Sequence, residues 1–472
     1  MDLLFMAWCN LLRNRRRTLA TLLGMVVGLT AVLLFGGYRS NILYGMQTGF
    51  VQYSGHLQIQ RRGWFLDGGD DPQAWGIADY PRIIDAIRRD AVLGPMVTVV
   101  TPTLQLGGIA GNFGEGVSRS VWAMGLVADE QERLRQWNDY DMVTYAPPLA
   151  LAGAAPDAAV VGAGVARRLR LCRLPGAPEC AAAEAAAAAP APASAPSAPS
   201  GAPAPGDLAA LSAQAAAPDA ALQPGRIELL VASRGGAPNV ASLQVVDVRN
   251  MGVKAIDDVY LALHLAQAQQ LVYGKGAKAV TAILVQLRHT QQLGAARARL
   301  QTLLAEAVPA QALDVLDYET LNPIYVQTDE FMASMFGFIA LLIGVIVLFS
   351  IANTMSTAVM ERTVEIGTLR AMGLRRGGVT RLFLYEALLL GTVGSALGLA
   401  LALAVEAGIN RSGWTWTPPG YSYAYLVLVR VGQDLPLLAG CIGGMLAVTL
   451  ASAWWPARRA ARLDVVEALR HA

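Results

Sequence analysis

The chain has 472 residues, of which 54% are hydrophobic and only 15% are charged. Ordinary soluble domains carry about 25% charged residues, so this composition excludes a typical cytosolic enzyme as well as a disordered chain, and it favours a membrane protein. The net charge of +2 gives no reason to expect a nucleic acid partner, and the four cysteines and four histidines show no zinc-type spacing. The sequence therefore predicts no metal site.

Four long uncharged blocks separate the polar parts of the chain. Each is long enough to cross a bilayer, which takes about 20 apolar residues, and buried helices of a soluble protein seldom come as four such blocks with charged flanks. The first block follows four arginines, but it is longer than the apolar core of a signal peptide and lacks a small-residue cleavage site, which favours an uncleaved anchor. We expect transmembrane helices at residues 18–38, 331–353, 383–406 and 435–455.

Positive charge gathers in three short segments beside these blocks. Residues 1–17 and 354–382 each carry a net charge of +3, and residues 456–472 carry +2. Short cytoplasmic segments of membrane proteins are enriched in arginine and lysine, so we expect an N-terminal segment, a loop and a C-terminal tail in the cytosol. Residues 39–330 and a short loop at 407–434 then lie on the other side of the membrane.

The segment at 39–330 alternates strand patterns with helix patterns. Interspersed strands and helices favour an α+β domain made of subdomains over a β-barrel or a long coiled coil. Strand candidates occur at 56–60, 97–101, 227–231, 243–248 and 282–287. Helical spacing of apolar residues occurs at 81–89, 129–137, 261–272 and 290–307.

Residues 175–225 differ from the rest of the outer segment. They contain ten of the 24 prolines among alanines and serines, a composition that favours extended, unpacked chain. We predict a disordered insertion, with a partner-binding arm as the alternative. Cys172 and Cys180 lie at its entrance, and the sequence leaves open whether they form a local disulfide or stay unpaired.

The most informative cytosolic stretch is Val359-Met-Glu-Arg-Thr-Val-Glu-Ile-Gly-Thr-Leu-Arg-Ala-Met-Gly373. Glu361 and Glu365 are four residues apart and share one face of a helix. A short amphipathic helix at the membrane surface, ended by Gly373, is therefore expected. From the residues alone, a solvated loop that carries the cytosolic arginines is an equal alternative.

The third block holds small residues and one acidic residue. Gly394 and Gly398 are four apart and follow Gly391, a spacing that allows close helix packing. Glu386 lies at the cytosolic entry of the block. It is expected either to reach the interface or to pair with Arg381 or an arginine of the preceding loop.

The run E-R-T-V-E-I-G-T-L-R-A-M-G, followed by Phe383-Leu-Tyr-Glu-Ala387, resembles the MacB/FtsX-type ABC permeases, a superfamily (type VII) that includes the lipoprotein-releasing permeases LolC and LolE. Further similar motifs are Asn10–Arg13, Val160–Leu169, Pro456–Ala460 and Glu467–Arg470. Val465 departs from the pattern, because the family usually has proline there. The insertion at 175–225 interrupts the module that continues at Gly225.

The resemblance implies four transmembrane helices with a large periplasmic domain between the first and second, in the bacterial inner membrane. It also implies two permease subunits, identical or paralogous, that bind two cytosolic ATPase subunits. No phosphate-binding G-x-x-x-x-G-K-[ST] motif occurs in the sequence, so no cofactor is expected on this chain, and ATP and magnesium are expected on the partner. The resemblance assigns the coupling helix, which docks on the ATPase, to Glu361, Arg362, Glu365, Ile366, Gly367, Leu369, Arg370 and Gly373. Ile366, Leu369 and Met372 are expected to form its apolar contact face.

Two functions follow from the resemblance. The first is export or release of an envelope substrate such as a lipoprotein, lipid, peptide or drug, driven by mechanical transmission from the ATPase and assisted by a periplasmic adaptor or lipoprotein. The alternative is an FtsX-like relay that activates a periplasmic cell-wall hydrolase without transport. The large outer segment favours the first function. An enzyme in the outer segment is disfavoured, because no nucleophile, metal or paired-carboxylate constellation occurs there.

Overall fold

The computed structural model of the chain divides into two compact units. The helical unit contains residues 1–47, 323–416 and 425–472, and the sheet unit contains residues 48–322 and 417–424. The structure describes residues 3–13, 15–68, 72–142, 148–171, 174, 225–233, 236–274, 278–417, 420 and 424–462. Cys172, Cys180, Val465 and all of 175–225 except Gly225 lie outside these ranges, so the disulfide and the insertion stay predictions.

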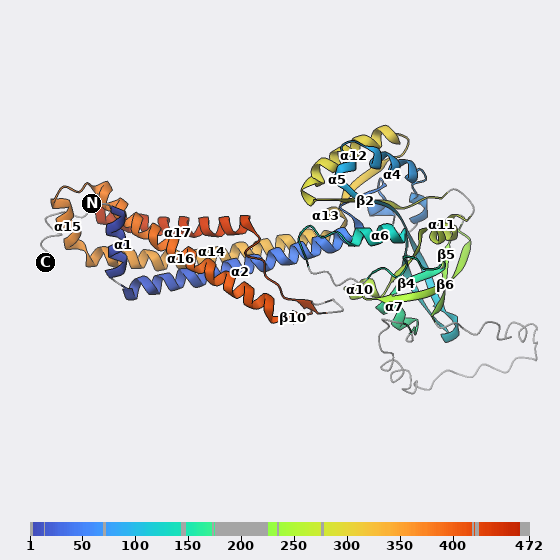
Figure 1. Ribbon diagram of the computed structural model, residues 1–472, viewed down its shortest axis with the longest axis horizontal. Coiled ribbons are helices and arrows are strands. Elements are labelled where there is room, and N and C mark those ends of the chain that lie inside the picture. Colours follow the sequence, from blue (N-terminus) through green and yellow to red (C-terminus); the bar gives the residue numbers. More distant parts are fainter. Residues whose placement is uncertain are drawn as a thin grey trace, which may run out of the picture. The chain divides into compact units, whose positions relative to one another are not determined.

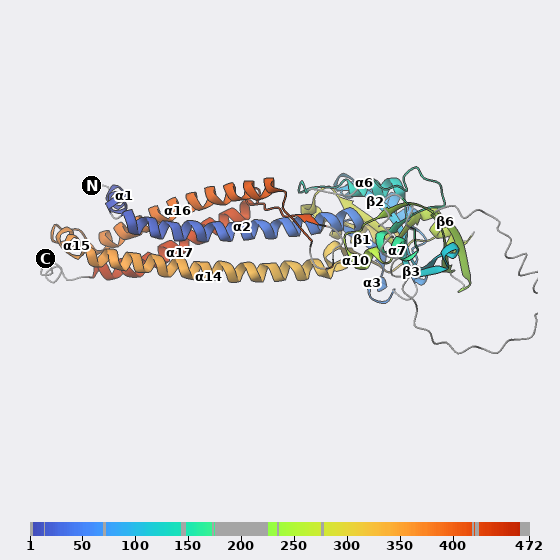
Figure 2. The same cartoon turned by 90° about the horizontal axis from the view of Figure 1, so that it is seen from below.

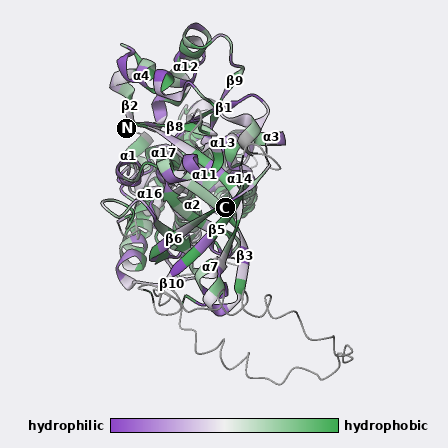
Figure 3. Cartoon of the chain, turned by 90° about the vertical axis from the view of Figure 1, so that its right-hand side faces the viewer, coloured by the Kyte–Doolittle hydropathy of each residue, from purple (hydrophilic) through white to green (hydrophobic). Residues whose placement is uncertain are grey.

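Four helices of the helical unit are long and apolar enough to cross a membrane. They run side by side in Figures 1 and 2, and Figure 3 colours them predominantly as hydrophobic. They are α2 (Arg15–Ser54, which continues into the sheet unit), α14 (Pro323–Glu361), α16 (Arg376–Ser412) and α17 (Leu435–Ala461). The prediction of four candidate membrane-spanning helices is confirmed by this count.

Two shorter helices and a small hairpin complete the helical unit. The helices are α1 (Leu3–Arg13) and α15 (Thr363–Ala371), and the hairpin pairs β10 (Thr415–Trp416) with β11 (Tyr425–Leu426). The long helices extend past the predicted spans: α14 has 39 residues, about 58 Å at 1.5 Å per residue, against a hydrocarbon core of about 30 Å.

Glycines of α16 sit where this helix meets its neighbours. A β-carbon on Gly391 would lie 3.1 Å from Leu446 of α17, and β-carbons on Gly394 and Gly398 would lie 3.1 Å from Met25 and Leu29 of α2. The hydroxyl of Thr30 in α2 donates to the carbonyl oxygen of Gly398 over 3.1 Å. Small residues at such contacts let helix backbones approach closely, so these glycines hold α2 and α17 against α16.

The sheet unit is built on nine strands in the order β3-β7-β4-β6-β5-β2-β8-β1-β9. The long strand β2 also pairs with β3, so β3, β7, β4, β6, β5 and β2 form a closed ring, while β8, β1 and β9 extend from the first half of β2. The strands are β1 (Leu57–Arg61), β2 (Val97–Asn112), β3 (Val117–Leu126), β4 (Ala158–Gly162), β5 (Arg226–Ala232), β6 (Pro238–Arg249), β7 (Tyr260–His264), β8 (Ala282–Leu287) and β9 (Leu313–Asp317).

Helices cover this sheet and contribute to its core. They are α3 (Trp64–Asp67), α4 (Tyr80–Arg89), α5 (Leu93–Met96), α6 (Ala128–Arg135), α7 (Ala163–Arg168), α10 (Lys254–Asp257), α11 (Leu265–Tyr273), α12 (Leu293–Ala307) and α13 (Tyr318–Leu321), with 3-10 turns at Pro72–Trp75, Phe113–Glu115 and Thr290–Gln292. In α4, for example, Ile83, Ile84 and Ile87 are buried at helical spacing.

All five strands expected from sequence are present, but one expectation about the outer segment is wrong and one feature of it was not expected. The helix expected at 261–272 begins only at Leu265, because Tyr260–His264 form the strand β7, whose first four residues are all buried. A short apolar run buried on both faces cannot be distinguished from a helix by periodicity. The closed ring was also not expected, since it depends on pairing along both edges of β2.

Candidate functional site

The helix expected near Glu361 and Glu365 is present as α15, but the two glutamates do not share it: Glu361 is the last residue of α14, and Glu365 lies in the first turn of α15. This helix follows α14 after a single residue, Arg362, and ends in a glycine with a backbone φ of 97° at Gly373. The N–H of Gly373 donates to the carbonyl of Arg370 over 3.0 Å, and the N–H of Leu374 donates to the carbonyl of Leu369 over 3.1 Å. These two bonds form a Schellman motif, in which glycine is favoured because a side chain strains the left-handed conformation.

One face of α15 is packed into the helical unit. Ile366 is only 4% exposed and Gly367 is buried, whereas Val364, Thr368 and Met372 are exposed at helical spacing. The expected apolar contact face of Ile366, Leu369 and Met372 is therefore divided: Ile366 belongs to the core, Leu369 is half-buried, and only Met372 is freely exposed. We call Val364, Thr368 and Met372 the exposed stripe. It was not predicted from the sequence, because its middle residue, Thr368, is polar.

Arg362 forms the centre of a buried polar cluster at the start of α15. Its Nη1 donates to Oε1 of Glu386 over 3.1 Å, and its Nη2 donates to the backbone carbonyl of Asn10 over 3.0 Å. The side-chain amide of Asn10 donates to the same Glu386 oxygen over 2.5 Å. The Arg362 and Glu386 side chains are only 13% and 4% exposed, so each charge depends on the other for compensation.

This cluster decides between the alternatives for Glu386. The carboxylate neither reaches the interface nor pairs with Arg381: it pairs with Arg362. This arginine belongs to the segment from Glu361 to Gly373, to which the resemblance assigns a coupling role and which we call the coupling segment. Its second partner, Asn10, lies in α1 and is 376 residues away in the sequence. The sequence offered no signal for that contact: Asn10 belongs to a motif that resembles the permease family, but neither the motif nor the positive charge of its segment indicates a partner in α16.

The two glutamates of the coupling segment pair with arginines near the N-terminus. Arg17 forms a two-point ion pair with Glu361, with nitrogen–oxygen distances of 2.7 and 3.0 Å, and Arg13 lies 2.5 Å from Glu365. These side chains are partly exposed, at 28% and 48% for the first pair and 65% and 45% for the second. Exposed pairs of this kind contribute about 0–1 kcal/mol each, so they can be exchanged for contacts with a partner at small cost.

These contacts meet at one end of the helical unit, where Figures 1 and 2 place α1 and α15. Glu365 connects α15 to α1, Glu361 connects the end of α14 to α2, and Arg362, between α14 and α15, connects to α1 and α16. Asn10 and Arg13 belong to α1, Arg17 begins α2, and Glu386 belongs to α16. We call Asn10, Arg13, Arg17, Glu361, Arg362, Glu365 and Glu386 the ionic cluster. A displacement of α15 must move these partners or break their ion pairs.

A second set of polar contacts holds the loop before α17. Glu406 of α16 accepts hydrogen bonds from the backbone N–H groups of Val431 and Gly432 over 3.1 and 3.2 Å. Asn410 forms a reciprocal pair of 2.9 Å hydrogen bonds with the backbone of Val429. The acidic residue near the end of the third span is therefore a loop anchor, and no sequence pattern indicated this use.

Comparison with known proteins places the coupling segment in a recognised domain. Residues 337–465 match the model of the FtsX-like permease C-terminal domain, which covers part of α14, all of α15 and α16, and the loop and helix that follow. Asn10, Arg13 and Arg17 lie outside this match, although they complete the ionic cluster.

Curated relatives match longer or shorter parts of the chain. The macrolide export ATP-binding/permease protein MacB of Bordetella avium is 29% identical over 194 residues, which cover 41% of this chain and 28% of the relative. The pyoverdine export ATP-binding/permease protein PvdT of Pseudomonas syringae is 37% identical over 161 residues, covering 32% and 22%. MacB of a Shewanella species is 29% identical over 269 residues, covering 55% and 39%. The chain thus spans less than half the length of each of these relatives.

Proposed function

We propose that this ABC permease chain couples ATP hydrolysis on a separate ATPase to export across the envelope. The proposal is supported by the FtsX-like permease domain at residues 337–465 and by the similarity to MacB and PvdT, which confirm the MacB/FtsX-type resemblance. The observation that carries the proposal is α15, a short helix with an exposed stripe, whose Glu365 pairs with α1 and whose preceding residue, Arg362, pairs with α16.

In this proposal the ATPase docks on the exposed stripe. Val364 and Met372 are 37% and 72% exposed, and Met360, at the end of α14, is 68% exposed. These side chains offer apolar surface, and methionine adapts to different partner shapes. Glu361, the last residue of α14, and Glu365, in the first turn of α15, are about half exposed and can add charge-assisted hydrogen bonds to an arginine or lysine of the partner.

Movement of the docked helix reaches the bundle by two routes. Arg362 connects α15 directly to the end of α14, which is helical from Pro323 to Glu361. The buried Arg362–Glu386 pair connects α15 to the start of α16. Since packed interiors resist compression, a push on α15 is expected to tilt or slide whole helices rather than deform them, which suits mechanical transmission.

ATP and magnesium are assigned to a partner in this proposal, because the sequence holds no phosphate-binding loop of the G-x-x-x-x-G-K-[ST] type. The relatives' names include ATP-binding, and the chain matches only part of each of them. Their names also specify export of a macrolide and of pyoverdine, which supports export over an FtsX-like relay. A second permease subunit, an inner-membrane location with cytosolic termini, and a periplasmic adaptor or lipoprotein belong to the same proposal.

Co-purification tests the docking surface. The tagged full chain is isolated from native membranes and bound ABC ATPase chains are quantified, for Met372→Asp and for Leu66→Asp as the control. Leu66 is 83% exposed and belongs to the sheet unit. We expect Met372→Asp to lose the ATPase and Leu66→Asp to keep it. Equal recovery in both variants would show that α15 is not the docking site.

A further inference from the structure

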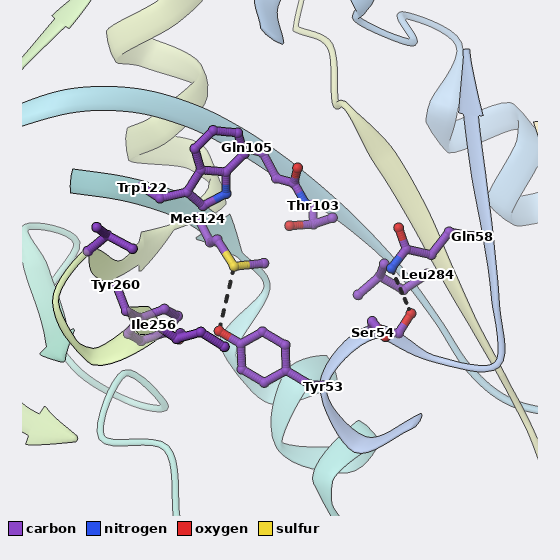
Figure 4. Close-up of a pocket in the computed structure, with 11 residues that line it drawn as sticks. Tyr53, Ser54, Gln58, Thr103, Gln105, Trp122, Met124, Ile256, Tyr260 and Leu284 are labelled. Carbon is purple, nitrogen blue, oxygen red and sulfur yellow. Dashed lines mark hydrogen bonds between the residues drawn. The ribbon is translucent and has the colours of Figure 1, made fainter. Parts of the chain in front are cut away.

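A cavity of about 360 Å³ opens into the sheet unit (Figure 4). Its rim includes Trp122 and Ile256, which are 36% and 44% exposed, and its depth is marked by Thr103 and Leu284, which are 1% and 2% exposed. The cavity therefore runs from the surface into the core. Its volume lies within the range of about 300–1,000 Å³ that is usual for small-molecule sites.

Strand geometry explains why this space is open. In the antiparallel pair of β2 and β3, Gln105 lies opposite Met124 and Gly107 lies opposite Trp122. Side chains two residues apart on a strand share a face, so Gln105, Met124 and Trp122 point to the same side of the hairpin. Gly107 places no side chain there, and a β-carbon on it would meet nothing within 4 Å.

The walls of the cavity are apolar and aromatic. Trp122, Met124 and Leu284 line it together with the rings of Tyr53 and Tyr260. The hydroxyl of Tyr53 donates to the sulfur of Met124 over 3.6 Å (Figure 4), which leaves the tyrosine ring as wall. None of the lining residues that the structure describes carries a charge. A charged ligand would lie among uncharged side chains, and burial of a charge without a partner costs several kcal/mol or a change of protonation.

The polar groups of the cavity divide by depth. The Gln58 amide donates to the Ser54 carbonyl over 3.1 Å, and the Thr103 hydroxyl donates to the Gly125 carbonyl over 3.3 Å, so the deep polar groups are already used. The Gln105 backbone N–H donates to the Thr281 hydroxyl over 2.9 Å, but within the described part of the chain neither the Gln105 side-chain amide nor the Trp122 indole N–H forms a hydrogen bond with another protein group. Both side chains lie on the face of the β2–β3 hairpin that lines the cavity, and Trp122 lies at the rim.

We propose that this cavity binds an uncharged amphiphile. Its apolar body lies against Met124, Leu284 and the tyrosine rings, and a hydrogen-bonding group at its polar end meets Gln105 and the Trp122 N–H. The last turn of α2, with Tyr53 and Ser54, forms part of the wall, so an occupied cavity contacts the same helix that begins at Arg15. This proposal goes beyond the export function and does not depend on it, since binding needs no ATPase.

Quenching of Trp122 fluorescence tests the proposal. The full chain in lipid nanodiscs is titrated with a bromine-terminated undecanol, whose bromine quenches an indole on contact. We expect a saturable component of quenching that disappears in Trp122→Phe, because the remaining tryptophans report only non-saturable partition into lipid. The matching bromine-terminated undecanoate should bind about tenfold or more weakly, because its carboxylate finds no counter-charge.

A matched pair of variants places the ligand in the cavity. Ser54→Leu fills the space next to Gln58 and Leu284 and should weaken the saturable component about tenfold or more, whereas Ser54→Ala, which removes only the hydroxyl, should weaken it far less. Val259→Phe fills the cavity from another wall if Ser54→Leu does not fold. Nanodiscs made of lipid with brominated chains distinguish the two possible sources of the ligand, the bilayer and the solution. Saturable quenching without added alcohol identifies a lipid chain, and quenching by the alcohol alone identifies a soluble amphiphile. Absence of any saturable component, or equal binding by Ser54→Leu and Ser54→Ala, would overturn the proposal.

Discussion

Arg362 and Glu386 form a buried ion pair, 3.1 Å apart, between the residue that precedes α15 and the first turns of α16. Removal of one partner leaves the other charge buried without compensation, which typically costs about 3–5 kcal/mol. We expect Glu386→Leu or Arg362→Met to lower the melting temperature of the full chain in nanodiscs strongly. The double variant should be more stable than either single variant, because no charge is then left unpaired. Additive losses in the double variant would contradict this coupling.

Asn10 offers a milder change at the same cluster. Its side-chain amide donates a charge-assisted hydrogen bond to Glu386, and such bonds contribute about 1.5–3 kcal/mol. Asn10→Asp places a second carboxylate beside Glu386 and should destabilise the chain more than Asn10→Ala. The melting temperatures of the two variants give the comparison, and equal values would mean that the short contact with Glu386 is not formed.

The ionic cluster shows what the sequence could and could not predict. Local chemistry offered a helix ending at Gly373 as one of two equal alternatives, because a glutamate pair at helical spacing followed by glycine is a local signal. It also gave four membrane helices from uncharged length alone. An arginine of the preceding loop was among the expected partners of Glu386, but the partners of Glu361 and Glu365 and the Asn10 contact of Glu386 were missed. These contacts join residues more than 340 positions apart and depend on how helices pack.

Part of the prediction for the outer segment failed for a related physical reason. Strands with clear alternation or β-branched runs, such as Ile227–Val231, were predicted, whereas β7 and the closed ring were not. A strand buried on both faces has no alternation to detect, and ring closure depends on which edges of β2 find partners. The cavity was equally invisible, because its walls come from Tyr53, Trp122, Tyr260 and Leu284, which are far apart along the chain.

Charge reversal at Glu365 distinguishes docking on the ATPase from ion pairing within the chain. We expect Glu365→Arg to keep membrane insertion and thermal stability, because its exposed pair with Arg13 contributes about 0–1 kcal/mol, and to lose ATPase-dependent function. Adding Arg13→Glu restores opposite charges within the chain. Activity should stay lost in this double variant if position 365 faces the ATPase. Recovery of activity would show that the internal pair, rather than docking, is what matters.

Substitution of Gly398 tests how closely α2 and α16 must pack. A β-carbon there would lie 3.1 Å from Leu29, whereas one on Gly408 in the same helix would meet nothing within 4 Å. Gly398→Val should therefore destabilise the chain by about 1–3 kcal/mol through overpacking, and Gly408→Val should have little effect. Thermal unfolding of both variants in the same lipid provides the measurement. Equal stability would mean that α2 and α16 can separate at no cost.

His56 predicts a loss of stability in mild acid. It is fully buried, its Nδ1 accepts the backbone N–H of Leu287 over 3.0 Å, and its Nε2 lies 3.2 Å from the hydroxyl of Thr290. Burial lowers the pKa of His56 to about 4, against an opposing effect of Asp139, while the unfolded chain keeps a pKa of about 6.5.

Because the folded pKa of His56 lies below the unfolded pKa, its contribution to stability is complete above about pH 6.5 and is lost as the pH falls towards about 4. The full loss is about 3 kcal/mol at 1.36 kcal/mol per pKa unit. His56→Gln keeps an acceptor for the Leu287 N–H but cannot be protonated in this range. We expect it to be less stable than the parent at neutral pH and to lose less stability between pH 7 and about 4.5, measured by melting temperature. Parallel pH profiles for the two proteins would show that His56 is not held neutral.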